Sequence, residues 1–244
     1  LLQNFVNSNI KCLGIEPTQN TANEAMLKGV PTLVNFFTES LAEQFAQDNE
    51  RADLIIANNV LAHVPDINDF VSGFKKLLKE EGTITVEFPH LFELVKHNEF
   101  DTIYHEHYFY FSLYTLNIIF NKHDLSIYDV EELETHGGSL RIYITHKGNI
   151  IDSNSIKNNV KRILNKELKS NVNTLDFYSS IQSNAFKIKL EALNYLVKQK
   201  INNKKIIAFG AAAKGNTFLN YSGIKKDIID FVVDETPYKI GKYM

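Results

Sequence analysis

The sequence has little of what defines several large classes of protein. Cys12 is the only cysteine in 244 residues, so an internal disulfide framework and a cysteine-rich zinc site within the chain are excluded, and a reducing cytoplasm is the expected compartment. No apolar run approaches the roughly 20 residues that a membrane-spanning helix needs. No signal peptide is apparent, because the chain starts Leu1-Leu2 without a basic segment or a small-residue cleavage site.

The sequence also lacks an excess of charge of one sign. It has 26 basic and 29 acidic residues, which are interspersed and give a formal charge of −3. A basic surface for nucleic acid is therefore not expected, and we predict a soluble protein with no nucleic-acid and no membrane partner. Apolar residues, by contrast, make up 44% of the chain, which is enough for the packed core of one large or two modest domains.

Short strands and helices alternate from residue 11 onward, as is typical of a parallel α/β sheet. The pattern predicts strands at 11–16, 32–37, 53–58 and 83–88. It predicts helices between Pro17 and residue 28, at 40–47 and at 67–79, with a turn at Glu80, Glu81 and Gly82. A helix at 113–122 follows, and then a hairpin of two strands, 125–132 and 139–146, around the turn His136-Gly137-Gly138.

The remainder of the chain divides into a connector and a second unit. Residues 150–202 are rich in Asn and Lys with spaced Ile, Leu and Val, a pattern typical of a solvated pair of connecting helices. A strand at 205–210, a helix at 211–221 and a strand at 228–234 then begin a second βαβ unit. We therefore predict three parts: an α/β domain at 1–149, a helical connector at 150–203 and a Rossmann-like unit at 204–244.

Residues 103–112 crowd four proton-handling side chains between aromatic ones: Tyr104, His105, Glu106 and His107. A histidine has an unperturbed pKa of about 6.5, so a neighbouring carboxylate or phenol can tune it into a general base. Two other interpretations stay open: the cluster closes an edge of the core, or its histidines and Glu106 bind a metal ion. In an extended strand the two histidines share one face and Glu106 points to the other, which makes a metal site the weaker alternative.

Polar residues follow two strands at the edge where open α/β sheets bind ligands. Glu16 ends the first strand, where an acidic residue commonly accepts hydrogen bonds from ribose hydroxyls, although an exposed loop carboxylate explains it equally well. Asn58, Asn59 and His63 follow the buried strand 53–58 and precede Asp66, a candidate helix N-cap. We expect these polar side chains to contact a ligand.

The segment 210–217, Gly-Ala-Ala-Ala-Lys-Gly-Asn-Thr, follows a strand and opens a helix. This position offers backbone N–H groups, the positive end of the helix and Lys214 to a diphosphate. The segment is neither a Walker motif, because the lysine precedes its glycine, nor a Gly-x-Gly-x-x-Gly fingerprint, because Ala212 replaces the second glycine. Close packing of the helix on its sheet is the alternative, but it accounts for the alanines and not for Lys214 or Asn216.

Five segments together carry a resemblance to a known family: Gly14-Ile15-Glu16-Pro17, residues 58–64, residues 100–107, His136-Gly137-Gly138-Ser139-Leu140-Arg141 and residues 210–217. They resemble the S-adenosylmethionine-dependent C-methyltransferases that act on nucleotide-linked keto-deoxysugars, of the 3-C-methyltransferase type. The similarity spans most of the chain. Its most specific parts are Tyr-His-Glu-His and His-Gly-Gly-Ser-Leu-Arg.

The resemblance also implies what this chain does not contain. The family is expected to carry an N-terminal zinc domain with clustered cysteines and a glycine-rich loop after the first strand of the methyltransferase sheet; neither is found here. Leu1 is not a methionine, and the segment that starts there is similar to the helix just after that loop. We therefore expect a fragment, with zinc only in the missing domain and with its isolated activity in doubt.

The family implies a class I methyltransferase-like Rossmann sheet and roles for individual residues. His107 would be the base that removes a proton next to a ketone, Tyr104 and His63 would donate to or orient the enolate oxygen, and Glu106 would anchor the sugar or polarise a histidine. No metal is required. The remaining assignments are cofactor contacts from Glu16, Asn58 and Asn59, and contacts to a nucleotide-diphosphate sugar from Lys214, Asn216, His136 and Arg141.

Two functions of other classes remain open. An NAD-dependent oxidoreductase would use the second βαβ unit, with Asp234 on the ribose. A non-catalytic nucleotide-sugar-binding module would keep the C-terminal site and would not bind S-adenosylmethionine.

Overall fold

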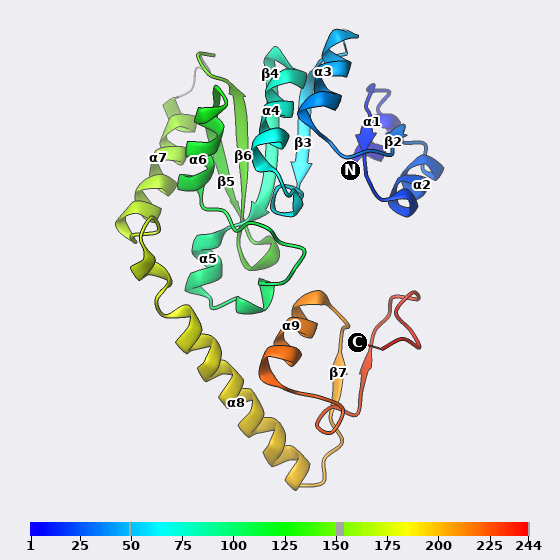
Figure 1. Ribbon diagram of the computed structural model, residues 1–244, viewed down its shortest axis with the longest axis vertical. Helices are drawn as coiled ribbons and strands as arrows, with labels where there is room; N and C mark the ends of the chain where they lie inside the picture. The colour runs from blue at the N-terminus through cyan, green and yellow to red at the C-terminus, as the bar shows by residue number, and fades with distance from the viewer. Residues whose placement is uncertain (49, 150–153, 244) are drawn as a thin grey trace.

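The computed structural model describes residues 1–48, 50–149 and 154–243, and its largest sheet has four strands in the order β3-β4-β6-β5. These strands are Ala52–Asn58 (β3), Leu78–Pro89 (β4), Ser139–His146 (β6) and Leu125–Leu133 (β5). β3 and β4 are parallel, whereas β6 is antiparallel to both β4 and β5. The expected α/β sheet that ends in an antiparallel hairpin is therefore confirmed (Figure 1).

The alternation of side chains along β4 sets the register of this sheet. Ile84, Val86 and Phe88 are buried at every second position and lie opposite Ile144, Ile142 and Leu140 of β6. Because side chains alternate between the two faces of a strand, a slip by one residue would move this apolar set to the other face. The central pair of strands is thus fixed by the burial of its own hydrophobic residues.

Four helices cover the sheet, and the last three of them contribute side chains to the same core. They are Glu39–Gln47 (α3), Ile67–Leu77 (α4), Leu113–Lys122 (α6) and Asn154–Lys169 (α7). Side-chain oxygens cap three of these helices at their N-termini, where backbone N–H groups lack partners within the helix. The caps are Thr38 for α3, Asp66 for α4 as the sequence predicts, and Ser112 for α6.

The N-terminal segment forms a separate small pair of strands. Gly14–Ile15 (β1) and Thr32–Leu33 (β2) are parallel, and within the described residues they form a sheet of their own. Two helices accompany them, Leu2–Asn7 (α1) and Gln19–Leu27 (α2). The strands predicted at 11–16 and 32–37 thus exist, but each is only two residues long.

The predicted turn at Glu80, Glu81 and Gly82 is wrong. β4 starts at Leu78, directly after α4, and runs through these three residues. Gly82 is needed for close packing, because a Cβ atom there would lie 2.7 Å from Leu78 Cδ1 and 3.1 Å from the Ala52 carbonyl oxygen. A glycine and two charged residues in sequence resemble a turn, but here a buried leucine starts the strand early.

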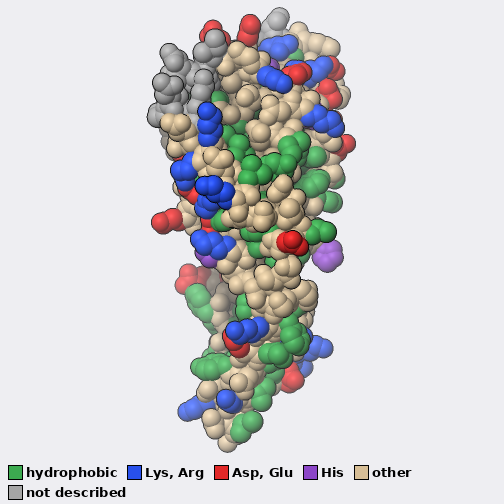
Figure 2. Space-filling view, turned by 90° about the vertical axis from the view of Figure 1, so that its left-hand side faces the viewer, with side chains coloured by type: hydrophobic (Ala, Val, Ile, Leu, Met, Phe, Trp, Pro, Cys, Tyr) green, Lys and Arg blue, Asp and Glu red, His purple; other side chains and the backbone are tan. Residues whose placement is uncertain are grey.

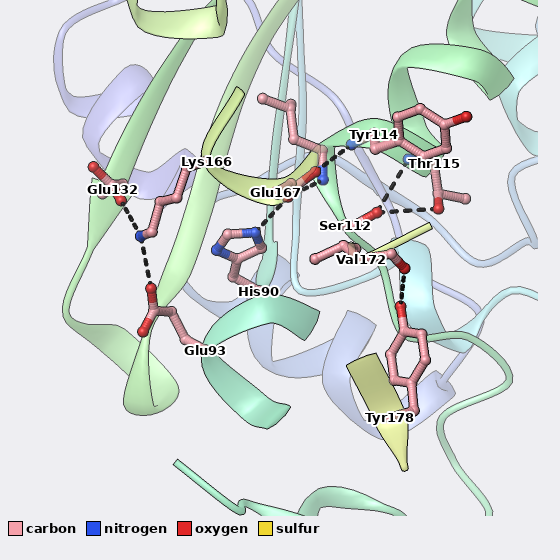
Figure 3. A network of polar contacts seen from close by, with 11 residues as sticks. His90, Glu93, Ser112, Tyr114, Thr115, Glu132, Lys166, Glu167, Val172 and Tyr178 are labelled. Atoms are coloured by element: carbon pink, nitrogen blue, oxygen red, sulfur yellow. Dashed lines mark hydrogen bonds and ion pairs between the residues drawn. The ribbon is translucent and has the colours of Figure 1, made fainter. Parts of the chain in front are cut away.

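Only part of the predicted connector is solvated. α7 buries Val160 and Ile163 in the core of the first domain, and it also buries Glu167 completely. The Glu167 carboxylate accepts hydrogen bonds from the backbone N–H groups of Leu113 and Tyr114 and lies 2.6 Å from His90 Nε2 (Figure 3). α7 is therefore a structural part of the first domain, contrary to the expected solvated helix pair.

The second half of the connector has the expected exposure. After a short turn of helix, Leu175–Tyr178 (η4), the chain enters the long helix Ile181–Ile201 (α8), which leads away from the sheet (Figure 1). Several large hydrophobic side chains of α8 are exposed: Phe186, Leu190, Tyr195, Val197 and Ile201. Figure 2 shows hydrophobic side chains interspersed with basic ones on one side of the molecule. No helix among the described residues is long and apolar enough to cross a membrane.

The C-terminal unit has the predicted βαβ order. Ile207–Phe209 (β7) and Phe231–Val233 (β8) are parallel, and Ala213–Ser222 (α9) connects them. α9 packs against η2, a single turn of helix at Phe100–Thr102 that follows the helix Leu91–Lys96 (α5). The C-terminal unit thereby touches the first domain close to the segment 103–112 (Figure 1).

Candidate active site

The segment 103–112 connects η2 to α6 and contains turns rather than an extended strand. Its fold brings the rings of Tyr104 and His107 together, with centroids 4.4 Å apart. His63, from the short helix Leu61–His63 (η1) after β3, lies with its ring centroid 4.9 Å from that of His107. Three of the four residues predicted for catalysis therefore form one cluster at the carboxyl-terminal edge of the sheet.

One ring nitrogen of His107 is engaged by the backbone. Nδ1–H donates to the Thr102 carbonyl oxygen at 3.0 Å, so in the neutral ring the lone pair is on Nε2. Burial lowers the pKa of His107 below its ordinary value, and the nearby His63 and Lys214 lower it further, whereas the bond to Thr102 and the Glu106 carboxylate oppose the shift. These effects favour the neutral imidazole, and its Nε2 atom makes no hydrogen bond within the described part of the chain.

Tyr104 retains its proton over a wide pH range. Burial raises the pKa of its phenol, and the negative charges of Glu106 and Asp101 raise it further, because each disfavours the phenolate. Burial likewise raises the pKa of Tyr110, whose ring lies against His107 with centroids 5.7 Å apart. Two phenol O–H groups therefore stand beside the candidate base, and that of Tyr110 donates to the Thr102 carbonyl oxygen at 3.5 Å.

His63 is held in one tautomer by a backbone group of the same segment. Its Nδ1–H donates to the Glu106 carbonyl oxygen at 2.8 Å, so its Nε2 atom is an acceptor in the neutral ring. His63 can donate to an enolate oxygen through Nε2 only when the ring is protonated. Of the two expected donors, Tyr104 keeps its O–H proton and can donate directly to an enolate oxygen.

The structure places Glu106 and His105 differently from the rest of the cluster. Both residues are exposed, and Glu106 holds His63 through its main-chain carbonyl oxygen. Its carboxylate acts on Tyr104 and His107 as a nearby negative charge. The sequence does not reveal Thr102 and Tyr110, which complete the cluster, because one contributes a carbonyl group and the other is one aromatic residue among several.

A small pocket adjoins His107 and has mainly apolar walls. It is lined by Ala62, Phe88, Pro89, Thr102, His107, Phe109, Tyr110 and Phe111. A separate cavity of about 290 Å³ shares none of these residues and is acidic, with Glu93, Glu132 and Glu134 beside His90 and the Gly137-Gly138 turn. Lys166 bridges Glu93 and Glu132 at 2.8 and 3.1 Å, so two of the three carboxylates already have a cationic partner.

Two residues predicted to bind a cofactor have unpaired buried atoms. Asn58 Oδ1 and Asn59 Oδ1, at the end of β3, are buried and find no hydrogen-bond partner within the described part of the chain. Asn59 has a positive φ of 54°, a left-handed conformation that asparagine tolerates better than most residues. A buried acceptor without a donor is costly, so these two oxygens fit a ligand that brings N–H or O–H groups.

Glu16 is found where the sequence predicts it, directly after β1. Its carboxylate accepts a hydrogen bond from the Thr18 backbone N–H at 2.8 Å, at the start of α2. This bond uses the Oε1 atom and orients the side chain in the loop between β1 and α2. The geometry is compatible both with a ribose contact and with a simple loop carboxylate.

His136 and Arg141 lie apart from the histidine cluster in their contacts. His136 is exposed in the left-handed turn after β5, where Gly137 also has a positive φ and packs so closely on Glu99 that a Cβ atom would overlap its carboxylate. Arg141 is bonded to Glu87 at 2.8 Å and to Glu131 at 3.4 Å across the sheet. Both remain predictions as substrate contacts.

The predicted diphosphate loop faces the first domain. Lys214 Nζ lies 3.8 Å from the Glu99 carboxylate and close enough to His107 to lower the pKa of the imidazole. Asn216 instead accepts a hydrogen bond from Asn220 within α9. Of the two residues predicted to bind a diphosphate, only Lys214 points toward the histidine cluster.

Asp234, the residue that an NAD site would need, is bound within its own unit. Its carboxylate accepts hydrogen bonds from the backbone N–H groups of Ala211 at 2.7 Å and Thr236 at 2.8 Å, and Lys239 lies 3.3 Å away. The bonds from Thr236 and Ala211 lower its pKa strongly. Asp234 thus holds the β7–α9 loop, and each of its two carboxylate oxygens already accepts a hydrogen bond from a backbone N–H group.

Comparisons with known protein families match nearly the whole chain. The family model described as a methyltransferase domain matches residues 1–130, and the model described as a C-methyltransferase C-terminal domain matches residues 134–244. The C-methyltransferase NovU of Streptomyces niveus is 30% identical over 243 residues, which are 100% of this chain and 57% of NovU. The chain therefore spans little more than half the length of this relative.

The chain is also similar to solved structures of methyltransferases. A possible histamine N-methyltransferase from Thermotoga maritima has a TM-score of 0.44 and 19% identity, over 59% of this chain and 76% of that one. Magnesium protoporphyrin IX methyltransferase from Synechocystis PCC 6803, solved with bound SAH, has a TM-score of 0.44 and 13% identity, over 58% and 66%. With TM-scores below 0.5, neither likeness adds to the family match.

Proposed function

Because this chain belongs to the methyltransferase domain family, we propose that it transfers a methyl group from S-adenosylmethionine to a sugar carbon next to a ketone in a nucleotide-linked keto-deoxysugar. The C-methyltransferase model over residues 134–244 and the name of the relative NovU support carbon as the methylated atom. The observation that carries the proposal is the geometry of His107, whose Nδ1–H is bonded to the Thr102 carbonyl oxygen and whose Nε2 makes no hydrogen bond to the residues that the structure describes.

Residues of the cluster have separate roles in the formation of the enolate. His107 Nε2 takes the proton from the carbon next to the ketone, and the electron pair of that C–H bond moves to form the enolate. Tyr104 O–H donates a hydrogen bond to the developing oxyanion, since its phenol, whose pKa is raised, stays protonated at neutral pH. The aromatic walls of the adjacent pocket limit the access of water to this base.

The residues at the sheet edge fit the cofactor. S-adenosylmethionine, when bound, supplies an electrophilic methyl group on a sulfonium sulfur. The unpaired Oδ1 atoms of Asn58 and Asn59 would accept hydrogen bonds from its amino or hydroxyl groups, which removes the cost of burying them without partners. Glu16 would accept the ribose hydroxyls, with its side chain oriented by the Thr18 N–H.

The C-terminal unit would hold the nucleotide-diphosphate part of the substrate. Lys214 and the backbone N–H groups at the start of α9 offer positive charge on the side that faces His107. A diphosphate there would compete with Glu99 for Lys214. This proximity supports a substrate that spans both units, with its sugar at the histidines and its phosphates at α9.

The test replaces the candidate base in the longest natural protein that contains this chain. His107→Asn should lower kcat by about 10²–10⁴-fold, with little change in the affinity for S-adenosylmethionine or nucleotide sugar, because a general base acts in the transition state. His105→Asn is the matched control: its imidazole is exposed, two residues away, and turnover should remain near the parental value.

A second readout follows the proton rather than the methyl group. If deprotonation is reversible, the parent in heavy water should exchange the substrate proton next to the ketone for deuterium, and His107→Asn should not. Near-parental turnover of His107→Asn would refute the role of His107. Calorimetric binding of NAD in place of S-adenosylmethionine would refute the proposed cofactor and favour an oxidoreductase.

A further inference from the structure

The segment 98–102 joins the two units of the molecule. Asn184 of α8 donates to Asn98 Oδ1 at 2.8 Å, and Lys214 of α9 pairs with Glu99 at 3.8 Å. The Phe100 ring, which is 9% exposed, lies 5.0 Å from the ring of Tyr221 and 6.2 Å from that of Phe218, measured between centroids. α9 therefore holds this segment by an aromatic contact and an ion pair.

The same segment orients the candidate base. Thr102 is 2% exposed, and its carbonyl oxygen accepts the Nδ1–H of His107 at 3.0 Å and the Tyr110 hydroxyl at 3.5 Å. Phe100 and Thr102 are the first and last residues of the single helical turn η2. A displacement of the Phe100 ring would therefore move the carbonyl group that sets the tautomer of His107.

We propose that Phe100 is a positioning residue: α9, through Phe218 and Tyr221, holds η2 so that the Thr102 carbonyl keeps His107 protonated at Nδ1 and unprotonated at Nε2. The consequence for catalysis depends on the proposed function, but the structural link does not. The C-terminal unit would then do more than bind substrate, because its docking on Phe100 keeps the base in its active tautomer.

The physical reason is that a neutral imidazole exists as two tautomers, and only a hydrogen-bond acceptor at Nδ1 selects the one with a basic Nε2. Without that acceptor, part of the His107 population carries its proton on Nε2 and cannot accept another there. In serine proteases, an aspartate carboxylate accepts the Nδ1–H of the catalytic histidine and selects this tautomer. Here a main-chain carbonyl group does it, and its position depends on side chains of another unit.

The experiment reads the tautomer directly by NMR of the chain labelled with ¹⁵N-histidine, at a pH where His107 is neutral. The His107 signals are assigned by their loss in His107→Asn. The parent should show a protonated Nδ1 and an unprotonated Nε2. Tyr221→Ala and Phe218→Leu should shift both nitrogens toward the average of the two tautomers, whereas Tyr221→Phe, which keeps the ring, should restore the parental signals.

A matched control removes an aromatic ring elsewhere. Phe186→Ala, on the exposed face of α8, should leave the His107 signals unchanged. Circular dichroism must show each variant to be folded, and Phe218→Leu is the milder change should Tyr221→Ala not fold. Folded Tyr221→Ala and Phe218→Leu variants with parental His107 signals would overturn the proposal.

Kinetics in the longest natural protein separate this inference from the proposed function. Tyr221→Ala should lower kcat by about 10–100-fold, as displacements remote from the chemistry do, and Tyr221→Phe should recover it. If Tyr221→Ala changes the tautomer of His107 but the parent protein methylates no nucleotide sugar, the proposed function is refuted and the link stands. A parental tautomer with lowered kcat would refute the link alone.

Discussion

His107 shows how a single residue can combine a free basic nitrogen with a low affinity for protons. Burial, His63 and Lys214 all disfavour its cation, and they outweigh the Glu106 carboxylate and the bond to Thr102. The base is therefore in its working form over more of the neutral range than an exposed histidine would be. A lower pKa also makes His107 a weaker base. A larger fraction of it is therefore unprotonated at neutral pH, but the driving force for proton transfer to it is smaller.

The pH dependence of kcat follows from this shift. Activity needs the neutral imidazole, so it should be lost as pH falls through the pKa of His107, and this acid limb should lie below about 6.5. Lys214→Met removes a nearby positive charge, which should raise the pKa and move the acid limb to higher pH. Lys226→Met, an exposed change on the same unit, should not move the limb. A limb that moves to lower pH in Lys214→Met would contradict the assignment of the limb to His107.

Some residues of the site can be predicted from the sequence, but the backbone groups that orient them cannot. Tyr104, His63 and His107 were predicted to act together, and the structure brings them within ring contact. The carbonyl groups of Thr102 and Glu106 that fix the two histidines leave no trace in residue type, because every residue carries one. The residue type of Glu106 therefore predicts a role for its carboxylate, whereas its contact with His63 is made by its main-chain carbonyl oxygen.

At the scale of elements, α7 was the least predictable. Its buried residues Val160, Ile163 and Glu167 follow helical spacing, but one of the three is charged, and the segment around them is rich in Asn and Lys. A set of residues at helical spacing that contains a glutamate is typical of a helix face exposed to solvent. The strands β5 and β6 were predicted nearly residue by residue, because their alternation and the His-Gly-Gly turn point to the same hairpin.

Glu167 is expected to be essential for the attachment of α7. Glu167→Ala would leave the N–H groups of Leu113 and Tyr114, and His90, without their buried acceptor, at a cost of about 2–5 kcal/mol in the free energy of unfolding. Urea unfolding followed by circular dichroism measures this change. Glu81→Ala, an exposed change on β4, is the control and should stay within about 0.5 kcal/mol of the parent. A loss of the same small size for Glu167→Ala would mean that water replaces the carboxylate.

At the scale of the whole molecule, the site belongs to two units that are joined by α8. The base and its donors come from the first domain, whereas Lys214 and the aromatic support of Phe100 come from the C-terminal unit. The family models confirm the resemblance that the motifs indicated, one over each part of the chain. The sequence predicted both units from their own βα patterns, but a contact between units depends on surfaces whose pairing no local pattern records.

Truncation tests where the first domain ends. A chain of residues 1–149 would lose α7, and with it the burial of Val160 and Ile163, worth about 1.5–3 kcal/mol each, and the acceptor for the start of α6. It should show no cooperative thermal transition by circular dichroism. A chain of residues 1–178 keeps α7 and η4, where the Tyr178 hydroxyl donates to the Val172 carbonyl oxygen at 2.7 Å (Figure 3), and it should melt cooperatively.

The two truncations also separate folding from the state of the base. The 1–178 chain lacks α9, so by the link through Phe100 its His107 should populate both tautomers although the domain is folded. Residues 1–203 are the control, because they add α8 and its bond to Asn98 but not the aromatic contact; His107 should be mixed there as well. Equal cooperative melting of the 1–149 and 1–178 chains would place the end of the first domain before α7, since a domain that loses two core side chains and a buried helix cap cannot keep its unfolding free energy unchanged.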